Sequence, residues 1–194
     1  TVFVGAHTSN WEMVMPALSR LGVPLAALYS PPTNPLLNQM LYNSRKEMNC
    51  ELVARDSAAR DMMRHLRKGR STGLIVDRRI DGGPDVSFFG LPKPSSLLPA
   101  KLALKYNINL VPGRVQRLHG AEFKVTFYPP IEVDIAIGDD DARALDMMNK
   151  VHEHFEQWIL EEPEEWFCPK RIWPKHAVRL NPDNAHTEAN HYAS

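Results

Sequence analysis

Residues 2–12, VFVGAHTSNWE, join a short apolar run to a polar block and indicate how the chain folds. Within the apolar run at 2–5, residues 2–4 predict a β-strand, and Ser9 or Asn10 is a residue type that caps a helix beginning directly afterwards. A strand followed at once by a helix is the repeating unit of α/β proteins. His7 is therefore expected in the loop between them, at the carboxyl end of a strand.

The polar block places an imidazole, His7, and a carboxylate, Glu12, five residues apart. In one continuous helix these positions would be about 140° out of phase, so they can pair only across a loop–helix junction. Histidine accepts and returns a proton near neutral pH, and a carboxylate that orients the ring is its usual partner. The pattern predicts a general base with an orienting carboxylate. Spacing alone equally allows a strand-end histidine and a glutamate that favours a helix N-terminus.

The rest of the chain alternates between strand-like and helix-like apolar periodicity. Further strands are predicted at 23–29, 51–54, 72–76, 109–117 and 122–128, and helices at 10–20, 35–47, 57–68, 96–106 and 140–161. Such alternation predicts an α/β fold with a mixed, largely parallel central sheet and helices on both faces. The turn at His119-Gly120 predicts one antiparallel hairpin, whereas residues 78–96 hold so many turn formers that a long loop is expected.

Sites in sheets of this kind lie outside the carboxyl ends of the strands. His7 and Asp77 both follow predicted strands directly, so these two residues, far apart in the sequence, could meet at one end of the sheet.

Composition limits the classes of function. A chain of 194 residues with 43% apolar content fits one globular domain, expected at 1–176, followed by a mobile tail at 177–194 that is poor in apolar residues. A formal net charge of zero gives no general reason to expect nucleic-acid binding. The chain opens inside a strand without an initiator methionine, so it is expected to be a piece of something longer.

No metal or cofactor is expected. The two cysteines, Cys50 and Cys168, lack the spacing of a metal site and suggest a reduced compartment. His152 and His154 lie two apart on a predicted helix and do not share a face, which argues against zinc there. No apolar run reaches the roughly 18–20 residues that span a bilayer.

Several motifs follow one another in a fixed order. They are HTSNWE at 7–12, Arg45 in NSRKE, Asp77 after GLIV, Phe88-Phe89-Gly90, and EEPEEWFCPKRIWPKH at 161–176. This set resembles the bacterial lipid A biosynthesis acyltransferases over about residues 1–176, with the first block as their HX4E motif. The resemblance implies a glycerolipid-acyltransferase-like fold and transfer of a fatty acyl group from an acyl-carrier-protein thioester to a hydroxyl of a lipid A precursor. It also implies work at a membrane surface, on the cytoplasmic face of the inner membrane.

The resemblance assigns roles to residues of this chain. His7 would remove the proton of the attacking hydroxyl and Glu12 would orient the ring, without an acyl-enzyme. The chain accordingly has no GxSxG nucleophile motif. The implied substrate-binding residues are Arg45, Asp77, Arg78, Phe88, Phe89 and Gly90. Four of them also have an ordinary reading: a solvated helix charge for Arg45, a turn residue for Asp77, and core packing for the two phenylalanines.

Two observations leave the substrates open. Arg78-Arg79 stands where the family often has glutamine after the aspartate, and family members usually carry an N-terminal membrane helix. The alternatives are an acyl-CoA-dependent acyltransferase on another glycolipid or lysophospholipid, a hydrolase, and a noncatalytic module that binds a glycolipid or the carrier. The late aromatic–basic stretch, with Trp166 and Trp173, suits a membrane interface or simple docking of the C-terminus.

Overall fold

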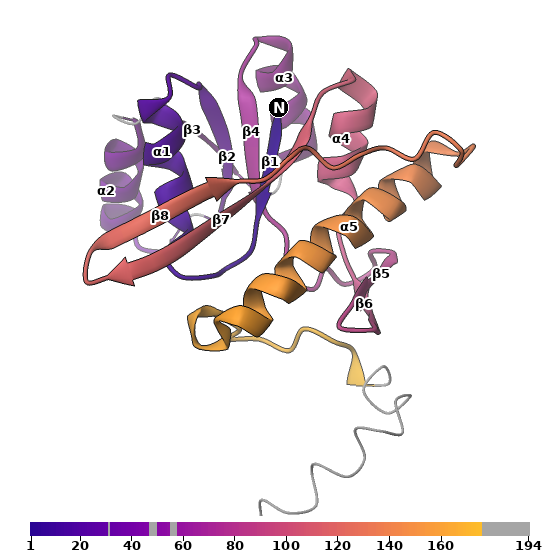
Figure 1. The fold of residues 1–194 in the computed structure, drawn as a ribbon. Helices are drawn as coiled ribbons and strands as arrows, with labels where there is room; N and C mark the ends of the chain where they lie inside the picture. The colour runs from indigo at the N-terminus through magenta and orange to yellow at the C-terminus, as the bar shows by residue number, and fades with distance from the viewer. Residues whose placement is uncertain (31, 47–49, 55–57, 176–194) are drawn as a thin grey trace, which may run out of the picture.

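The computed structural model describes residues 1–30, 32–46, 50–54 and 58–175, and its centre is a six-stranded sheet (Figure 1). The strands are β1 (Val2–Gly5), β2 (Leu25–Tyr29), β3 (Cys50–Ala54), β4 (Ser71–Ile75), β7 (Leu110–His119) and β8 (Glu122–Phe127). They lie in the order β3-β2-β4-β1-β7-β8. All neighbours pair in parallel except β7 and β8, which form the antiparallel hairpin predicted around His119-Gly120. The mixed, largely parallel sheet is confirmed.

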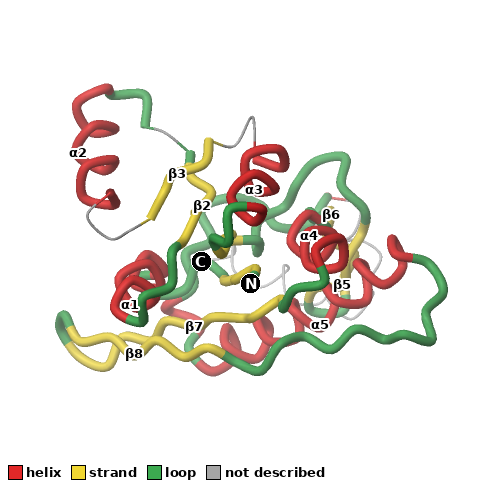
Figure 2. The backbone as a smooth tube through the Cα atoms, turned by 90° about the horizontal axis from the view of Figure 1, so that it is seen from above, coloured by secondary structure: helices red, strands yellow, loops and turns green. Residues whose placement is uncertain are grey.

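Helices cover both faces of this sheet. They are α1 (Val14–Arg20), α2 (Pro35–Lys46), α3 (Ala58–Arg67), α4 (Leu98–Tyr106) and α5 (Asp140–Glu161), with 3₁₀ turns η1 (Trp11–Met13) and η3 (Pro163–Glu165). Residues of α3, α4 and α5 pack on one face, while α1 packs on the other. Seen from above, α2 stands apart from α1 beside β3 (Figure 2). Asn10 precedes η1 as predicted, but its side chain makes no capping hydrogen bond.

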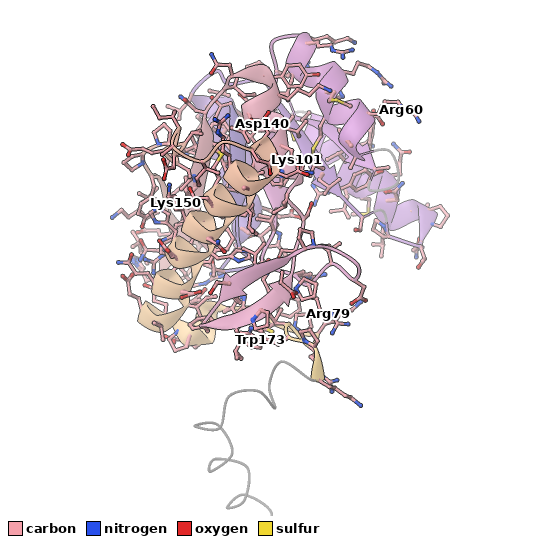
Figure 3. All side chains as sticks on the ribbon, turned by 90° about the vertical axis from the view of Figure 1, so that its right-hand side faces the viewer. Arg60, Arg79, Lys101, Asp140, Lys150 and Trp173 are labelled. Carbon is pink, nitrogen blue, oxygen red and sulfur yellow. The ribbon has the colours of Figure 1, made fainter. Side chains whose placement is uncertain are left out.

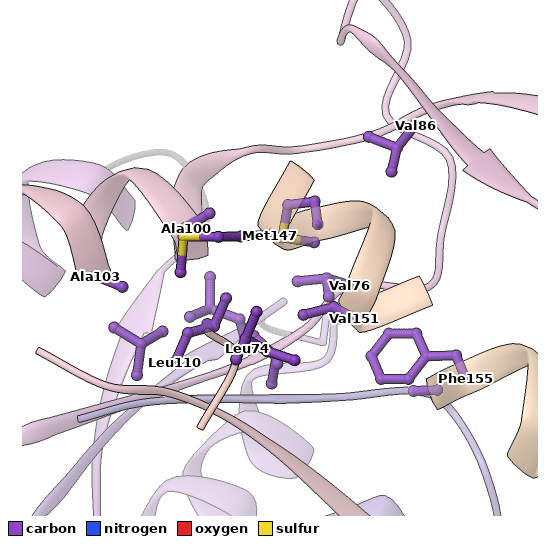
Figure 4. Close-up of a cluster of buried hydrophobic side chains, with 14 of the residues drawn as sticks. Leu74, Val76, Val86, Ala100, Ala103, Leu110, Met147, Val151 and Phe155 are labelled. Carbon is purple, nitrogen blue, oxygen red and sulfur yellow. The ribbon is translucent and has the colours of Figure 1, made fainter. Parts of the chain in front are cut away.

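The side chains on the two faces of β1 pack into two different hydrophobic clusters. Val2 and Val4 face the larger core, which includes Leu74, Met147 and Phe155 and is shown in Figure 4. Phe3 points the other way, toward the small cluster around Leu18 of α1. Because successive side chains of a strand alternate between faces, this one strand ties both layers to the sheet. The larger core fixes where β1 ends, and therefore where His7 lies.

The predicted loop at 78–96 is wrong, because it contains a β-hairpin. Strands β5 (Asp85–Phe88) and β6 (Leu91–Pro94) pair in an antiparallel manner. Phe89 and Gly90 both have positive φ, at 52° and 70°, as a two-residue type I′ turn requires. Val86 and Phe88 are buried while Asp85 and Ser87 are exposed, so the two-residue periodicity of a strand was present. Prolines on both sides obscured it.

The described part of the chain holds no helix of the length and apolar content needed to cross a bilayer. The predicted tail at 177–194 lies outside the described residues.

Candidate active site

His7 and Asp77 meet beyond the ends of two neighbouring parallel strands. Gly5 of β1 pairs in register with Ile75 of β4, so the residues two positions later leave the sheet at the same level. His7 Nδ1 lies 2.5 Å from Asp77 Oδ1, and the His7 backbone N–H donates to Oδ2 at 3.1 Å. The prediction that these two residues meet is confirmed, and their contact involves the ring itself.

The Asp77 carboxylate is ionised and fully engaged. Its side chain is 1% exposed, and the indole N–H of Trp166 donates to Oδ2 at 3.0 Å. Burial acts to raise the pKa of Asp77, but the hydrogen bonds and charge of His7, together with the bond from Trp166, outweigh burial and hold this pKa below its ordinary value. Because a carboxylate only accepts, Nδ1 of His7 carries the proton. Nε2 is then the nitrogen left to take a proton from a substrate.

The C-terminal segment fixes the loop that carries His7. Thr8 forms an isolated antiparallel bridge with Trp166. The backbone N–H of Ser9 donates to Glu165 O at 2.8 Å, and that of Phe167 donates to His7 O at 2.8 Å. In Figure 1 this segment, drawn in orange to yellow, turns back after α5 and passes beneath that helix. The contacts of Trp166 therefore agree with docking of the C-terminal segment, one of the two interpretations of the aromatic–basic stretch. The sequence did not indicate that Trp166 is a neighbour of Asp77.

Glu12 has a different partner from the one expected. Its carboxylate forms an ion pair with the Arg45 guanidinium of α2. The carboxylate on the His7 ring is that of Asp77, so the expected contact between His7 and Glu12 is replaced by two separate pairs. The physical reason is that η1 begins only at Trp11, which turns Glu12 toward α2, whereas Asp77 enters at the level of the ring from the adjacent strand.

A cavity of about 840 Å³ opens beside the ring. Its apolar wall comes from the α1 side of the sheet and from α1 and α2, and includes Phe3, Val14, Met15, Leu25, Leu41 and Leu52. The cavity passes His7 and Asp77 and also reaches Glu12 and Arg45. Cavities of this size that combine an apolar wall with a few polar groups are typical of small-molecule sites.

Glycines form part of the cavity floor. Gly73 of β4, Gly5 of β1 and Gly113 of β7 line it from three neighbouring strands. A β-carbon at Gly73 would lie 3.5 Å from the Leu25 side chain, an ordinary contact, whereas one at Gly5 would lie 3.2 Å from Gly113 O. Because these positions lack side chains, the cavity reaches the sheet backbone itself.

Cationic side chains surround one side of the cavity. Arg78, Arg79, Lys170 and Arg171 line it, and Arg79 pairs with the exposed Asp81 at 2.8 Å. Figure 3 shows Arg79 and Trp173 at the end of the molecule opposite Asp140, where the C-terminal segment passes. This side of the cavity therefore favours an anionic group.

Three of the predicted substrate-binding residues lie elsewhere. Phe88 is fully buried, 5.7 Å from the Trp173 ring between ring centres, and Phe89 packs edge-on against Phe88 at 4.8 Å. Gly90 occupies the β5–β6 turn. None of the three lines the cavity, because the hairpin folds against α5, where the Phe89 N–H donates to Glu156 at 2.6 Å and the Ser87 N–H donates to Asn149 at 3.0 Å. Core packing is the reading that the structure supports for Phe88.

Within the described ranges, no group of three or more His, Cys, Asp or Glu side chains is arranged to bind a metal ion. His152 is fully buried, with Nδ1 lying 2.9 Å from Ser87 O.

Comparison with known proteins identifies the family of the chain. A protein-family model described as bacterial lipid A biosynthesis acyltransferase matches residues 1–175. The chain is also similar to a protein named lipid A biosynthesis acyltransferase from Haemophilus influenzae, at 24% identity over 169 residues. That match covers 84% of this chain and 48% of the relative, so the chain spans about half the length of the relative. Since the family model covers nearly all of the described residues, the chain belongs to the bacterial lipid A biosynthesis acyltransferase family.

Proposed function

We propose that this chain transfers a fatty acyl group from an acyl-carrier-protein thioester to a hydroxyl of a lipid A precursor, with His7 as the general base. The observation that carries the proposal is the His7–Asp77 pair at the mouth of an apolar cavity. Family membership supports acyl transfer in lipid A biosynthesis. The carrier-protein donor and the exact acceptor belong to the proposal.

The chemistry follows from the ring's orientation. His7 Nε2 takes the proton of the acceptor hydroxyl as its oxygen attacks the thioester carbonyl. The tetrahedral intermediate collapses with cleavage of the C–S bond, and the imidazolium returns the proton to the departing sulfur. An ester and a free thiol result, and the base is regenerated. Asp77 holds the ring with Nε2 toward the cavity and stabilises its charged form, which is the role expected for Glu12 from the sequence.

Arg45 and Glu12 receive a separate role. The Arg45 side chain is 10% exposed, and its Nε has no hydrogen-bond partner among the described residues. We assign Arg45 to an anionic group of the bound substrate, with Glu12 fixing the guanidinium across the cavity. Arg78 and its cationic neighbours face the same cavity and suit the phosphates of a glycolipid acceptor or the headgroups of an inner-membrane surface.

A donor and acceptor matrix tests the proposal. The protein is incubated in lipid vesicles with acyl carrier protein or coenzyme A thioesters and with a lipid A precursor or a lysophospholipid, and products are followed by mass. Acylated lipid A precursor formed from the carrier thioester is the expected product. Preference for the coenzyme A donor or the lysophospholipid would replace the proposed substrates. Free fatty acid as the main product would indicate a hydrolase, and binding without turnover a noncatalytic module.

The glycine floor gives a prediction about the donor. Gly73→Ala adds one methyl group to the cavity where the acyl chain is proposed to lie, while its contact with Leu25 leaves the fold unstrained. The ratio of long-chain to short-chain transfer is expected to fall roughly tenfold, because one methylene in an apolar pocket changes specificity by that order. Competition between two donors that differ by two carbons measures this ratio.

The matched control is Gly138→Ala, whose β-carbon would meet no atom within 4 Å and whose site lies outside the cavity. An unchanged product ratio in Gly73→Ala would show that the acyl chain does not pass over β4.

A further inference from the structure

Lys93 of β6 is a buried cation directly behind Asp77. The residue is 0% exposed, and its ammonium donates a hydrogen bond to the backbone carbonyl of Asp77 at 3.0 Å. The same ammonium lies 5.2 Å from the centre of the Phe88 ring. Lys93 does not line the cavity, so it acts on the site through Asp77 and not through substrate.

A charge in this position needs a compensating group, because burial of an unpaired ammonium is costly. Burial lowers the pKa of Lys93 to about 8, and the charge of Asp77 opposes that effect. The titratable neighbour on α5 is His152, whose pKa is lowered to about 3, mainly by burial and also by Lys93, so this ring stays neutral. The charges facing each other behind the site are therefore the Lys93 ammonium and the Asp77 carboxylate.

We propose that Lys93 tunes the proposed base through charge: its ammonium, bonded to the Asp77 main-chain carbonyl, balances the Asp77 carboxylate from behind and so limits how strongly that carboxylate favours the charged form of the His7 ring. This inference rests on the proposed role of His7 as base. In this role the β5–β6 hairpin does more than pack against α5. Its strand β6 places the Lys93 ammonium behind Asp77, and Phe88 of β5 lies against that ammonium.

The sign of the effect on His7 distinguishes this role from a purely structural one. A cation behind the carboxylate disfavours the imidazolium form of His7, so removing the cation makes the ring easier to protonate. If Lys93 served only to shape the backbone, its loss would displace Asp77, and a ring without its carboxylate would be harder to protonate. The two roles therefore move the titration of the ring in opposite directions.

Lys93→Met is the informative variant, because it removes the ammonium and keeps a side chain of similar length. It leaves the buried Asp77 carboxylate without its cation, which is destabilising, so its unfolding free energy is measured beside its activity. Below the acid limb of the pH–rate profile we expect kcat to fall about three- to tenfold with little change in KM, because more of the base is protonated there. The acid limb of the pH–rate profile is expected to move up by about 0.5–1 pH unit. Lys93→Arg keeps the charge and should keep the acid limb at the wild-type pH. The control is Lys105→Met, at an exposed lysine of α4.

Nuclear magnetic resonance measures the same effect without any substrate. The pH midpoint of the His7 ring signal should rise in Lys93→Met, and the ammonium ¹⁵N signal of Lys93 in the wild type should shift as His7 titrates. In His7→Ala, the Lys93 signal should no longer show this shift. An unchanged or lowered His7 midpoint, or a Lys93 signal indifferent to His7, would overturn the proposal. Because these titrations need no turnover, their outcome is separate from that of the transfer assay.

Discussion

Replacing His7 with alanine is expected to lower kcat for acyl transfer by about 10²–10⁴-fold, the usual worth of general-base assistance. The loss should fall on kcat, because the apolar wall and the cationic side of the cavity remain in place to bind both substrates. Initial rates at saturating donor, followed as acylated lipid by mass, measure the change. The free energy of unfolding is expected to fall as well, because the variant leaves the buried Asp77 carboxylate without the His7 ring, so folding of the variant is checked before rates are compared.

His119→Ala is the matched control, because His119 is an exposed histidine at the far end of β7. It should transfer at the wild-type rate. Turnover by His7→Ala equal to that of this control would remove His7 from the mechanism and leave the cavity as a binding site.

Replacing Asp77 with asparagine is expected to lower kcat by an amount on the same order, about 10²-fold or more, while the fold survives. The amide can turn its N–H₂ toward Nδ1, which favours the tautomer with the proton on Nε2, where a base must have none. Glu12→Gln breaks the pair with Arg45 instead and should act mainly on KM. Comparing kcat and KM for these two variants shows which carboxylate serves the base. A larger loss of kcat in Glu12→Gln than in Asp77→Asn would restore Glu12 to the role that the sequence suggested.

The Asp77 carboxylate is also expected to affect how the stability of the fold depends on pH in acid. Because its folded-state pKa is lowered, ionised Asp77 stabilises the fold fully above about pH 4, and this contribution is lost as pH falls through the folded-state value. Asp77→Asn has no such group to titrate. Its unfolding free energy should depend less steeply on pH in the acid range than that of the wild type, as measured by denaturant titration.

The sequence predicted what depends on local pattern. The alternation of strand and helix patterns predicted the largely parallel sheet. Because the apolar run ends at residue 5, the sequence also predicted that His7 lies in the loop beyond the strand. Because sites in such sheets lie at the carboxyl ends of the strands, Asp77 was predicted at the same end of the sheet as His7. The sequence did not assign Asp77 to the ring, because that contact depends on the register between β1 and β4, which are about 70 residues apart in the chain.

The remaining differences have the same origin. Glu12 is near His7 in sequence, yet its direction is set by where η1 starts and by α2, which contributes Arg45. Lys93 stands between two prolines and carries no motif, so its burial behind Asp77 follows only from the pairing of β5 with β6 and the docking of that hairpin. Long-range contacts of this kind are not encoded in any single window of sequence.

The bridge between Thr8 and Trp166 has a consequence for how the protein matures. His7 leaves the ribosome among the first residues of this sequence, whereas the indole that bonds Asp77 leaves roughly 160 residues later. At typical synthesis rates of about 5–20 residues per second, that interval is on the order of ten seconds or more. The proposed catalytic pair is thus incomplete throughout that interval. A chain cut short before Trp166 would hold the proposed base but lack the indole and backbone hydrogen bonds that fix His7 and Asp77.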